Sequence, residues 1–143
     1  MSGKNKDIVE AFVVAAFEKN DRQKVRQLLA PNFVDHDPKV PGKEVSHEGF
    51  ERHVLDVLHD AFPDLSVSIE ALVGEDSDVV CRYTMTGTHE GTLREVEPSG
   101  NQVSVTGMAQ LRIDGQEITE LWINADSLAL MEQIGALDHD HHG

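Results

Sequence analysis

The chain is poor in cysteine, in basic residues and in long apolar runs. Cys81 is its single cysteine, so no disulfide can form within the chain and nothing points to secretion. No apolar run approaches the roughly 20 residues that span a membrane. The N-terminus leads into a charged segment and lacks the apolar core of a signal peptide. At 143 residues the chain has the length of one domain, which we assign to residues 1–137 and expect to be cytoplasmic.

Basic residues are the second shortage: 12 Lys and Arg stand against 26 Asp and Glu, a formal net charge of −14. Nucleic acid and anionic membrane surfaces repel such a chain, so neither is an expected partner. Two interpretations of the acidity remain open. The chain is either an ordinary acidic protein or one adapted to high salt, where screening lets dense surface carboxylates lie close together without strong repulsion.

The high-salt interpretation predicts that thermal stability rises with salt concentration. Salt screens the repulsion among the carboxylates, and salts excluded from the protein surface strengthen hydrophobic burial. Thermal unfolding in a series of KCl concentrations measures the effect. An unfolding midpoint that stays flat or falls up to molar KCl removes the high-salt interpretation.

Apolar residues follow helical spacing in three stretches between residues 7 and 62. Residues 7–19 carry one apolar face and predict the first helix. Asp21 is a suitable N-cap for a second, short helix that Pro31 should end. Ser46 is a suitable N-cap for a third helix, in which apolar residues recur every four positions until Pro63 ends it. We expect an extended segment and a loop between the second and third helices, at residues 32–37 and 39–45.

The second half of the chain alternates between apolar and polar residues, as strands do. Four segments are predicted to be strands: residues 67–73, 79–85, 103–113 and 116–124. Ser127 can cap a final short helix that Gly135 ends. Three helices followed by four strands predict an α+β fold, with helices on one face of a curved antiparallel sheet. The His- and Asp-rich tail, residues 138–143, is predicted to be disordered.

Asp114-Gly115 is a strong signal for a two-residue hairpin loop, and such a loop fixes the register of the last two strands. The predicted pairs are Ile113 with Gln116, Leu111 with Ile118, Ala109 with Glu120, Gly107 with Trp122, and Val105 with Asn124. Glu120, Trp122 and Asn124 then share one inner face with Asp126, opposite small residues that leave room for a ligand. The alternative is tight core packing, in which Gly107 merely admits the indole ring.

The other face of the same strand pair is partly apolar. Met108, Leu121 and Ile123 lie on it in this register. A lone small domain exposes less apolar surface than this. We therefore predict a homodimer through the outer face of the sheet.

Two carboxylates are candidates for acid/base chemistry, because burial in an apolar pocket raises a carboxyl pKa toward neutral pH. They are Asp126 and Glu120. Asp126 has an alternative role as the cap of the last helix. Glu120 has an alternative role as a structural partner of an arginine or a backbone amide.

Histidines provide further candidates. Asp35 and Asp37 flank His36, and such neighbours raise the pKa of a histidine and orient its ring; a pocket role and a loop role remain open. The adjacent residues Asp35, His36 and Asp37 cannot all surround one ion, so we expect no metal site. His89 shares the face of Tyr83 and could reach the pocket.

The sequence has no phosphate loop, dinucleotide fingerprint, serine elbow or paired-cysteine zinc pattern, so no cofactor is expected.

A series of short motifs runs through nearly the whole chain in the order of one family. They are Phe33-Val34-Asp35-His36, Gly49-Phe50, Ala61-Phe62-Pro63-Asp64-Leu65, Arg82, Gly87-Thr88-His89-Glu90-Gly91, Pro98-Ser99-Gly100, Asp114-Gly115-Gln116-Glu117-Ile118, Glu120-Leu121-Trp122, Asp126 and Leu128-Ala129-Leu130-Met131-Glu132-Gln133-Ile134-Gly135. In these motifs and in their order, the chain resembles the SnoaL-like polyketide cyclases of the nuclear transport factor 2-like superfamily. The resemblance implies a cone-shaped curved sheet around three helices, with a pocket inside, often in a homodimer. The alternating pattern of the last strand predicts that Trp122 lies inside that cone.

The resemblance also implies an activity. Family cyclases close a ring by intramolecular aldol condensation without metal or cofactor, and an aspartate near the end of the last strand removes a proton beside a carbonyl. Asp126 matches that residue, with Glu120 as the alternate. Residues 103–113 lack the histidine that the cyclases carry there, so His36 or His89 would substitute.

The expected function is therefore proton abstraction from, and cyclisation or isomerisation of, a hydrophobic carbonyl compound. Asp126, His36 and Glu120 are the expected catalytic residues; Trp122, Asn124, His89 and Tyr83 are expected to bind the substrate. One alternative is a non-catalytic protein that binds a small lipophilic molecule. Another is a ketosteroid-isomerase-like or epoxide-hydrolase-like enzyme.

Overall fold

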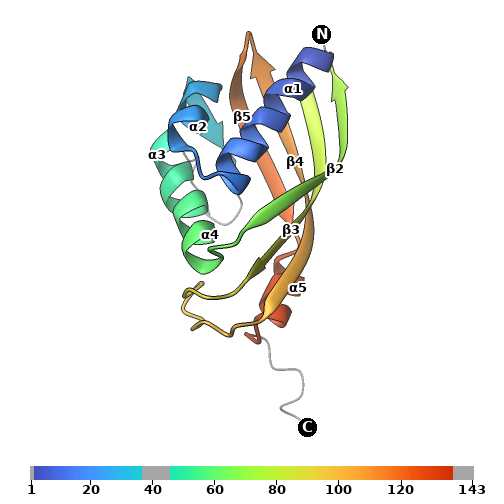
Figure 1. The fold of residues 1–143 in the computed structure, drawn as a ribbon. Helices are drawn as coiled ribbons and strands as arrows, with labels where there is room; N and C mark the ends of the chain where they lie inside the picture. Colours follow the sequence, from blue (N-terminus) through green and yellow to red (C-terminus); the bar gives the residue numbers. More distant parts are fainter. Residues whose placement is uncertain (1, 37–45, 137–143) are drawn as a thin grey trace.

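A computed structural model describes residues 2–36 and 46–136 of the chain as a curved sheet with helices packed on one face (Figure 1). The first helix, α1, continues into a π-helical turn, η1, and a short helix, α2, follows. A second continuous helical stretch, called here the 47–61 helix, consists of α3, η2 and α4. The bounds are α1 Ser2–Val13, η1 Val14–Glu18, α2 Arg22–Leu28, α3 His47–Phe50, η2 Glu51–Leu55, α4 Asp56–Ala61 and, after the last strand, α5 Ser127–Gln133.

The sheet has five strands in the order β1-β5-β4-β3-β2. They are β1 Leu29–Asp35, β2 Ser66–Glu75, β3 Asp78–Thr88, β4 Gln102–Asp114 and β5 Glu117–Ala125. The last four strands pair antiparallel, and β1 pairs parallel with β5. The predicted α+β class, with helices against a curved sheet, is confirmed.

The N-terminal elements differ from the prediction in detail. The first helix begins at Ser2 instead of residue 7, and α2 ends at Leu28, three residues before Pro31. The predicted extended segment is longer and is a sheet strand, with Pro31 inside it. Proline is tolerated there because β1 lies at the edge of the sheet. Asp37, the loop 39–45 and the tail 138–143 lie outside the described residues.

Two of the predicted helix caps have different outcomes. The Asp21 carboxylate accepts a hydrogen bond from the Lys24 backbone N–H at 3.1 Å, so this prediction is confirmed. Ser46 stands at the N-cap position of the 47–61 helix, but its side chain makes no capping hydrogen bond.

No helix among the described residues is both long and apolar enough to cross a membrane.

Aromatic rings from three elements join the helices to the sheet. The Phe50 ring of the 47–61 helix packs 5.7 Å from Phe12 of α1 and 5.9 Å from Phe33 of β1, measured between centroids. All three side chains are buried. A second buried cluster at the far end of the sheet includes Phe62 and Leu130. The helices are therefore fixed at both ends of the inner face.

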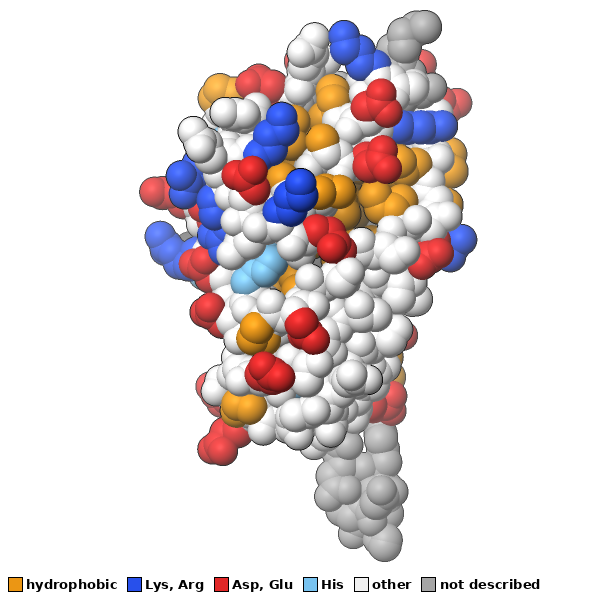
Figure 2. All heavy atoms as spheres, viewed as in Figure 1, with side chains coloured by type: hydrophobic (Ala, Val, Ile, Leu, Met, Phe, Trp, Pro, Cys, Tyr) orange, Lys and Arg blue, Asp and Glu red, His pale blue; other side chains and the backbone are white. Residues whose placement is uncertain are grey.

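Charged side chains are spread over the outside. Figure 2 shows acidic groups spread over the visible face, with no single acidic patch. Some are paired: Arg26 Nε lies 2.8 Å from Glu51 Oε2. This hydrogen bond holds the pKa of Glu51 below its ordinary value.

The β4–β5 register differs from the prediction, and the difference changes which residues face inward. The turn is Gly115-Gln116, with Gly115 at φ +70°, and Ile113 pairs with Ile118. An extra residue, Thr119, is then accommodated as a bulge, and its hydroxyl donates a hydrogen bond to the Arg112 carbonyl at 3.2 Å. A bulge of one residue reverses the inside–outside alternation of every residue that follows.

The predicted inner face of β5 was therefore wrong. Trp122 pairs with Gln110, and Asn124 pairs with Met108, on the face opposite the core. Leu121 is buried in the core and Ile123 packs against it, where the prediction had them outside. The apolar surface invoked for a homodimer thus reduces to Met108, and the homodimer remains a prediction.

Candidate functional site

A cavity of about 500 Å³ opens beside the inner face of the sheet. Its walls come from the 47–61 helix, from β3, β4 and β5, from the loop after β3 and from the start of α5. Most of the lining is apolar: Val54, Val57, Leu58, Met85, Leu93, Val105, Ile123, Ala125 and Leu130. The polar lining residues are His53, Tyr83, Arg94, Asp126 and Ser127. A concave, mostly apolar site with a few polar groups is the usual form of a small-molecule pocket.

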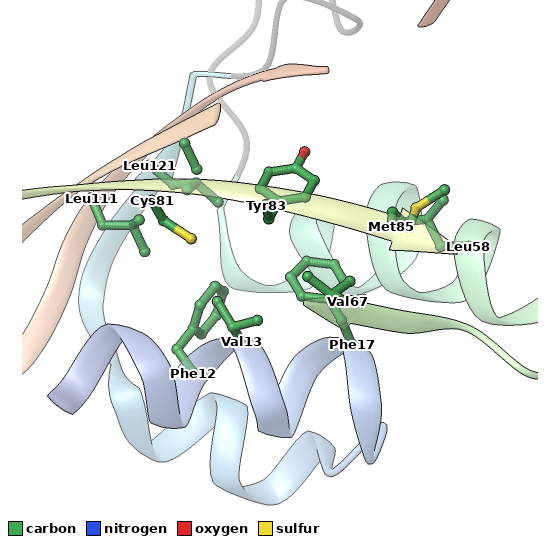
Figure 3. Close-up of a pocket in the computed structure, with 11 residues that line it drawn as sticks. Phe12, Val13, Phe17, Leu58, Val67, Cys81, Tyr83, Met85, Leu111 and Leu121 are labelled. Atoms are coloured by element: carbon green, nitrogen blue, oxygen red, sulfur yellow. The ribbon is translucent and has the colours of Figure 1, made fainter. Parts of the chain in front are cut away.

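A smaller apolar chamber of about 50 Å³ lies deeper, between α1 and the sheet (Figure 3). Leu58, Tyr83 and Met85 line both cavities and so form a wall that the two share. The other residues around the chamber are Phe12, Val13, Phe17, Val67, Cys81, Ala109, Leu111 and Leu121. Burial raises the pKa of the Cys81 thiol to about 11, so this thiol stays protonated and unreactive at neutral pH.

Asp126 lies at the rim of the larger cavity, between β5 and α5. Its Oδ1 accepts a hydrogen bond from the Ala129 backbone N–H at 3.0 Å, which caps α5. Its own backbone N–H donates to the Thr106 carbonyl at 3.0 Å. Oδ2 makes no hydrogen bond with any described residue. The carboxylate is thus held by its backbone and by one oxygen, and the residue is exposed at the rim.

Tyr83 takes the space that the prediction gave to Trp122. A Cβ added at Gly107 would come within 2.6 Å of Tyr83 Cζ and still closer to the hydroxyl. Gly107 therefore makes room for the phenol and not for the indole. The Tyr83 side chain lines both cavities, and its part in substrate binding stays a prediction.

His36, Glu120 and Trp122 form a cluster on the opposite face of the sheet. The His36 ring stacks on the Trp122 ring with centroids 4.7 Å apart and an interplanar angle of 9°. His36 Nε2 lies 3.0 Å from Glu120 Oε1, and Arg112 Nη1 lies 2.9 Å from Glu120 Oε2. Asp78 and Glu120 together raise the pKa of Arg112. Glu120 thus has the structural role, as partner of an arginine, that the sequence left open.

The structure does not bring these residues to Asp126. Asn124 is exposed on the same outer face, and His89 is fully buried but does not line the cavity. His89 Nδ1 accepts a hydrogen bond from the Ser99 backbone N–H at 3.1 Å, which fixes the loop between β3 and β4. Of the seven predicted site residues, Asp126 and Tyr83 meet at one pocket.

Sequence reasoning missed Arg94 and did not place His53 at the site. It predicted Ser127 as the cap of the last helix, but Asp126 is that cap, and Ser127 lines the cavity instead. A loop residue has no periodicity, so only the folded loop shows that Arg94 reaches the cavity. Among residues 2–36 and 46–136, no three His, Cys, Asp or Glu side chains lie together in a way that could hold a metal ion.

Comparison with solved structures gives three similar proteins. AclR from Streptomyces galilaeus, a proposed hydroxylase, has a TM-score of 0.85 at 25% identity over 96% of this chain and 99% of its own. A proposed SnoaL-like polyketide cyclase from Jannaschia sp. CCS1 has a TM-score of 0.84 at 25% identity, covering 96% and 95%. IdmH from Streptomyces antibioticus, a proposed polyketide cyclase, has a TM-score of 0.81 at 26% identity, covering 92% and 98%.

No curated protein matches the chain significantly. The family model of the SnoaL-like polyketide cyclases, in contrast, matches residues 7–134, which is nearly the whole described fold. The chain belongs to the SnoaL-like polyketide cyclase family.

Proposed function

We propose that the chain is a cofactor-free enzyme that removes a proton beside the carbonyl group of a hydrophobic compound and so promotes an aldol-type cyclisation or an isomerisation. The observation that carries the proposal is the placement of Asp126. A carboxylate at the rim of a mostly apolar cavity, with one oxygen committed to a helix cap and the other uncommitted, is positioned to exchange a proton with a bound ligand.

The residues that line the cavity can account for every proton moved in this reaction. Asp126 Oδ2 takes the proton from the carbon next to the carbonyl, and the electron pair of that C–H bond moves into an enolate. Tyr83 and His53 are the candidate donors to the enolate oxygen. The enolate carbon then attacks a second carbonyl of the same molecule and forms the new C–C bond. The resulting alkoxide takes back the proton from Asp126.

A non-catalytic binding protein for a lipophilic molecule is the second candidate. The inner chamber favours it, because that space is apolar and Asp126 does not line it. Such a chamber increases hydrophobic contact with a ligand and adds nothing to proton transfer.

Solvent deuterium exchange separates the two functions. The protein is incubated in D₂O with hydrophobic diketones whose carbonyl groups are three or four carbons apart, and mass spectrometry follows deuterium at the carbon beside each carbonyl. We expect exchange and ring closure well above the rates without protein. Diketones that are fully methylated at those carbons cannot enolise and are the matched control. Ligands that raise the unfolding temperature without any exchange would favour the binding protein.

A further inference from the structure

Arg94 reaches the cavity from the tip of the loop between β3 and β4. The tip is a tight turn closed by two backbone hydrogen bonds, Leu93 N–H to the Val96 carbonyl at 2.9 Å and Val96 N–H to the Leu93 carbonyl at 2.7 Å. Its two central residues, Arg94 and Glu95, both have positive φ, +48° and +69°. Turns of this kind usually have asparagine and glycine at these two positions, because most residues that carry a Cβ disfavour a positive φ.

The loop holds this unfavourable turn because its other parts are fixed. Leu93 is buried against the second core cluster. The Glu90 and Gly91 backbone N–H groups both donate to the Ala61 carbonyl, at 2.9 and 3.1 Å, and so attach the loop to the end of the 47–61 helix. Backbone strain of this kind persists where the surroundings impose it, and it clusters at binding sites.

Arg94 has no partner within the described part of the chain. It makes no hydrogen bond or ion pair with any residue in 2–36 or 46–136, whereas Arg26 and Arg112 are both paired with carboxylates. A guanidinium at the mouth of an apolar cavity is suited to bind a carboxylate through two parallel hydrogen bonds.

The negative charge of the chain makes a cation at the position of Arg94 selective for anionic ligands. At a net charge of −14, with Asp126 at the same cavity, an anionic ligand is repelled unless a local cation compensates. Arg94 supplies that charge at the cavity, and the mostly apolar walls accept the rest of the ligand.

From these observations we infer that the substrate carries a carboxylate, which Arg94 holds at the mouth of the cavity while the apolar part extends toward the wall of Leu58, Tyr83 and Met85. The inference rests on the proposed function, because it names the class of carbonyl compound on which Asp126 acts: a hydrophobic keto acid. Arg94 is then a specificity-determining residue, and the strained turn is what places it.

The affinities of β-benzoylpropionic acid and of its methyl ester, measured by calorimetry, test the inference, because the two ligands differ by one negative charge. The wild-type protein should bind the acid about 10-fold more tightly than the ester, the usual scale for one charge-assisted hydrogen-bonded pair. Arg94→Gln should remove this preference and leave the affinity for the ester unchanged. Arg94→Lys should restore part of it.

Arg82→Gln is the matched control. Arg82 is exposed and pairs with Met108 across the outer face of the sheet, so its loss should change neither affinity. The inference is overturned if the wild type binds both ligands equally, if Arg94→Gln weakens both by the same factor, or if inorganic phosphate displaces the acid at similar concentrations. These readouts do not require turnover. Acid-selective binding without deuterium exchange refutes only the proposed function, and exchange on ester and acid alike refutes only the inference.

Discussion

Replacement of Asp126 by asparagine is expected to lower turnover by about 100-fold or more, the usual scale for the loss of an acid/base group. The amide of asparagine cannot accept the proton that the carboxylate oxygen takes from the substrate. Its carbonyl oxygen can still accept the hydrogen bond from the Ala129 backbone N–H, and asparagine is as good an N-cap as aspartate. The helix α5, and with it the wall of the cavity, should therefore be unchanged.

Asp21→Asn is the matched control, because Asp21 has the same structural role without a pocket. It caps α2 by accepting from the Lys24 backbone N–H, and it does not line the cavity. Initial rates and thermal unfolding should be measured for both variants. If both lose activity alike, or if Asp126→Asn unfolds with normal activity per folded molecule, Asp126 serves the fold as a cap and not the reaction.

The helices and the fold class were predictable because they depend on local signals. The apolar spacing in residues 7–19 and the cap at Asp21 act within a few residues of chain, and both are seen in the structure. Pro31 shows the limit of such signals. The sequence predicts that Pro31 ends a helix, but this residue lies inside an edge strand, a place that only the arrangement of the whole sheet defines.

The site was predictable only where it did not depend on strand register. The face of the sheet on which Glu120 and Trp122 lie is predicted by counting residues along β5. A single bulged residue, Thr119, moves both residues to the opposite face. Nothing in the sequence marks that bulge, because the threonine hydroxyl bond that accompanies it is made to a residue on the neighbouring strand. Asp126 lies beyond the last paired residue of β5, where its position follows from the start of α5.

Arg94 was not predictable at all. Its position depends on a turn that its own residue types disfavour and on contacts between distant segments. The contact of His89 with Ser99 joins the two ends of the loop. The contact of Gly91 with Ala61 joins the loop to the end of the 47–61 helix, which is far from Arg94 along the chain. The same contacts make the loop a structural part of the cavity wall, so a substitution at its base should affect both stability and binding.

Gly91→Ala is expected to destabilise the fold by about 3 kcal/mol, the upper part of the usual range for an overpacked site. A Cβ there would lie 2.8 Å from the Asp60 carbonyl carbon and would overlap the carbonyl oxygen, and these backbone atoms cannot rotate away. The loop must then move from the end of α4, breaking its bonds to the Ala61 carbonyl. In thermal unfolding the loss corresponds to roughly 10 °C.

Gly100→Ala in the same loop separates this steric effect from backbone strain. Gly100 has φ +75° and open space around its Cα, so alanine there should lose only about 1 kcal/mol, through the left-handed conformation alone. Because Leu93 and Arg94 line the cavity, Gly91→Ala should also weaken ligand binding, whereas Gly100→Ala should not. Equal unfolding midpoints for the two variants would show that the loop can leave the helix freely and does not hold Arg94 in place.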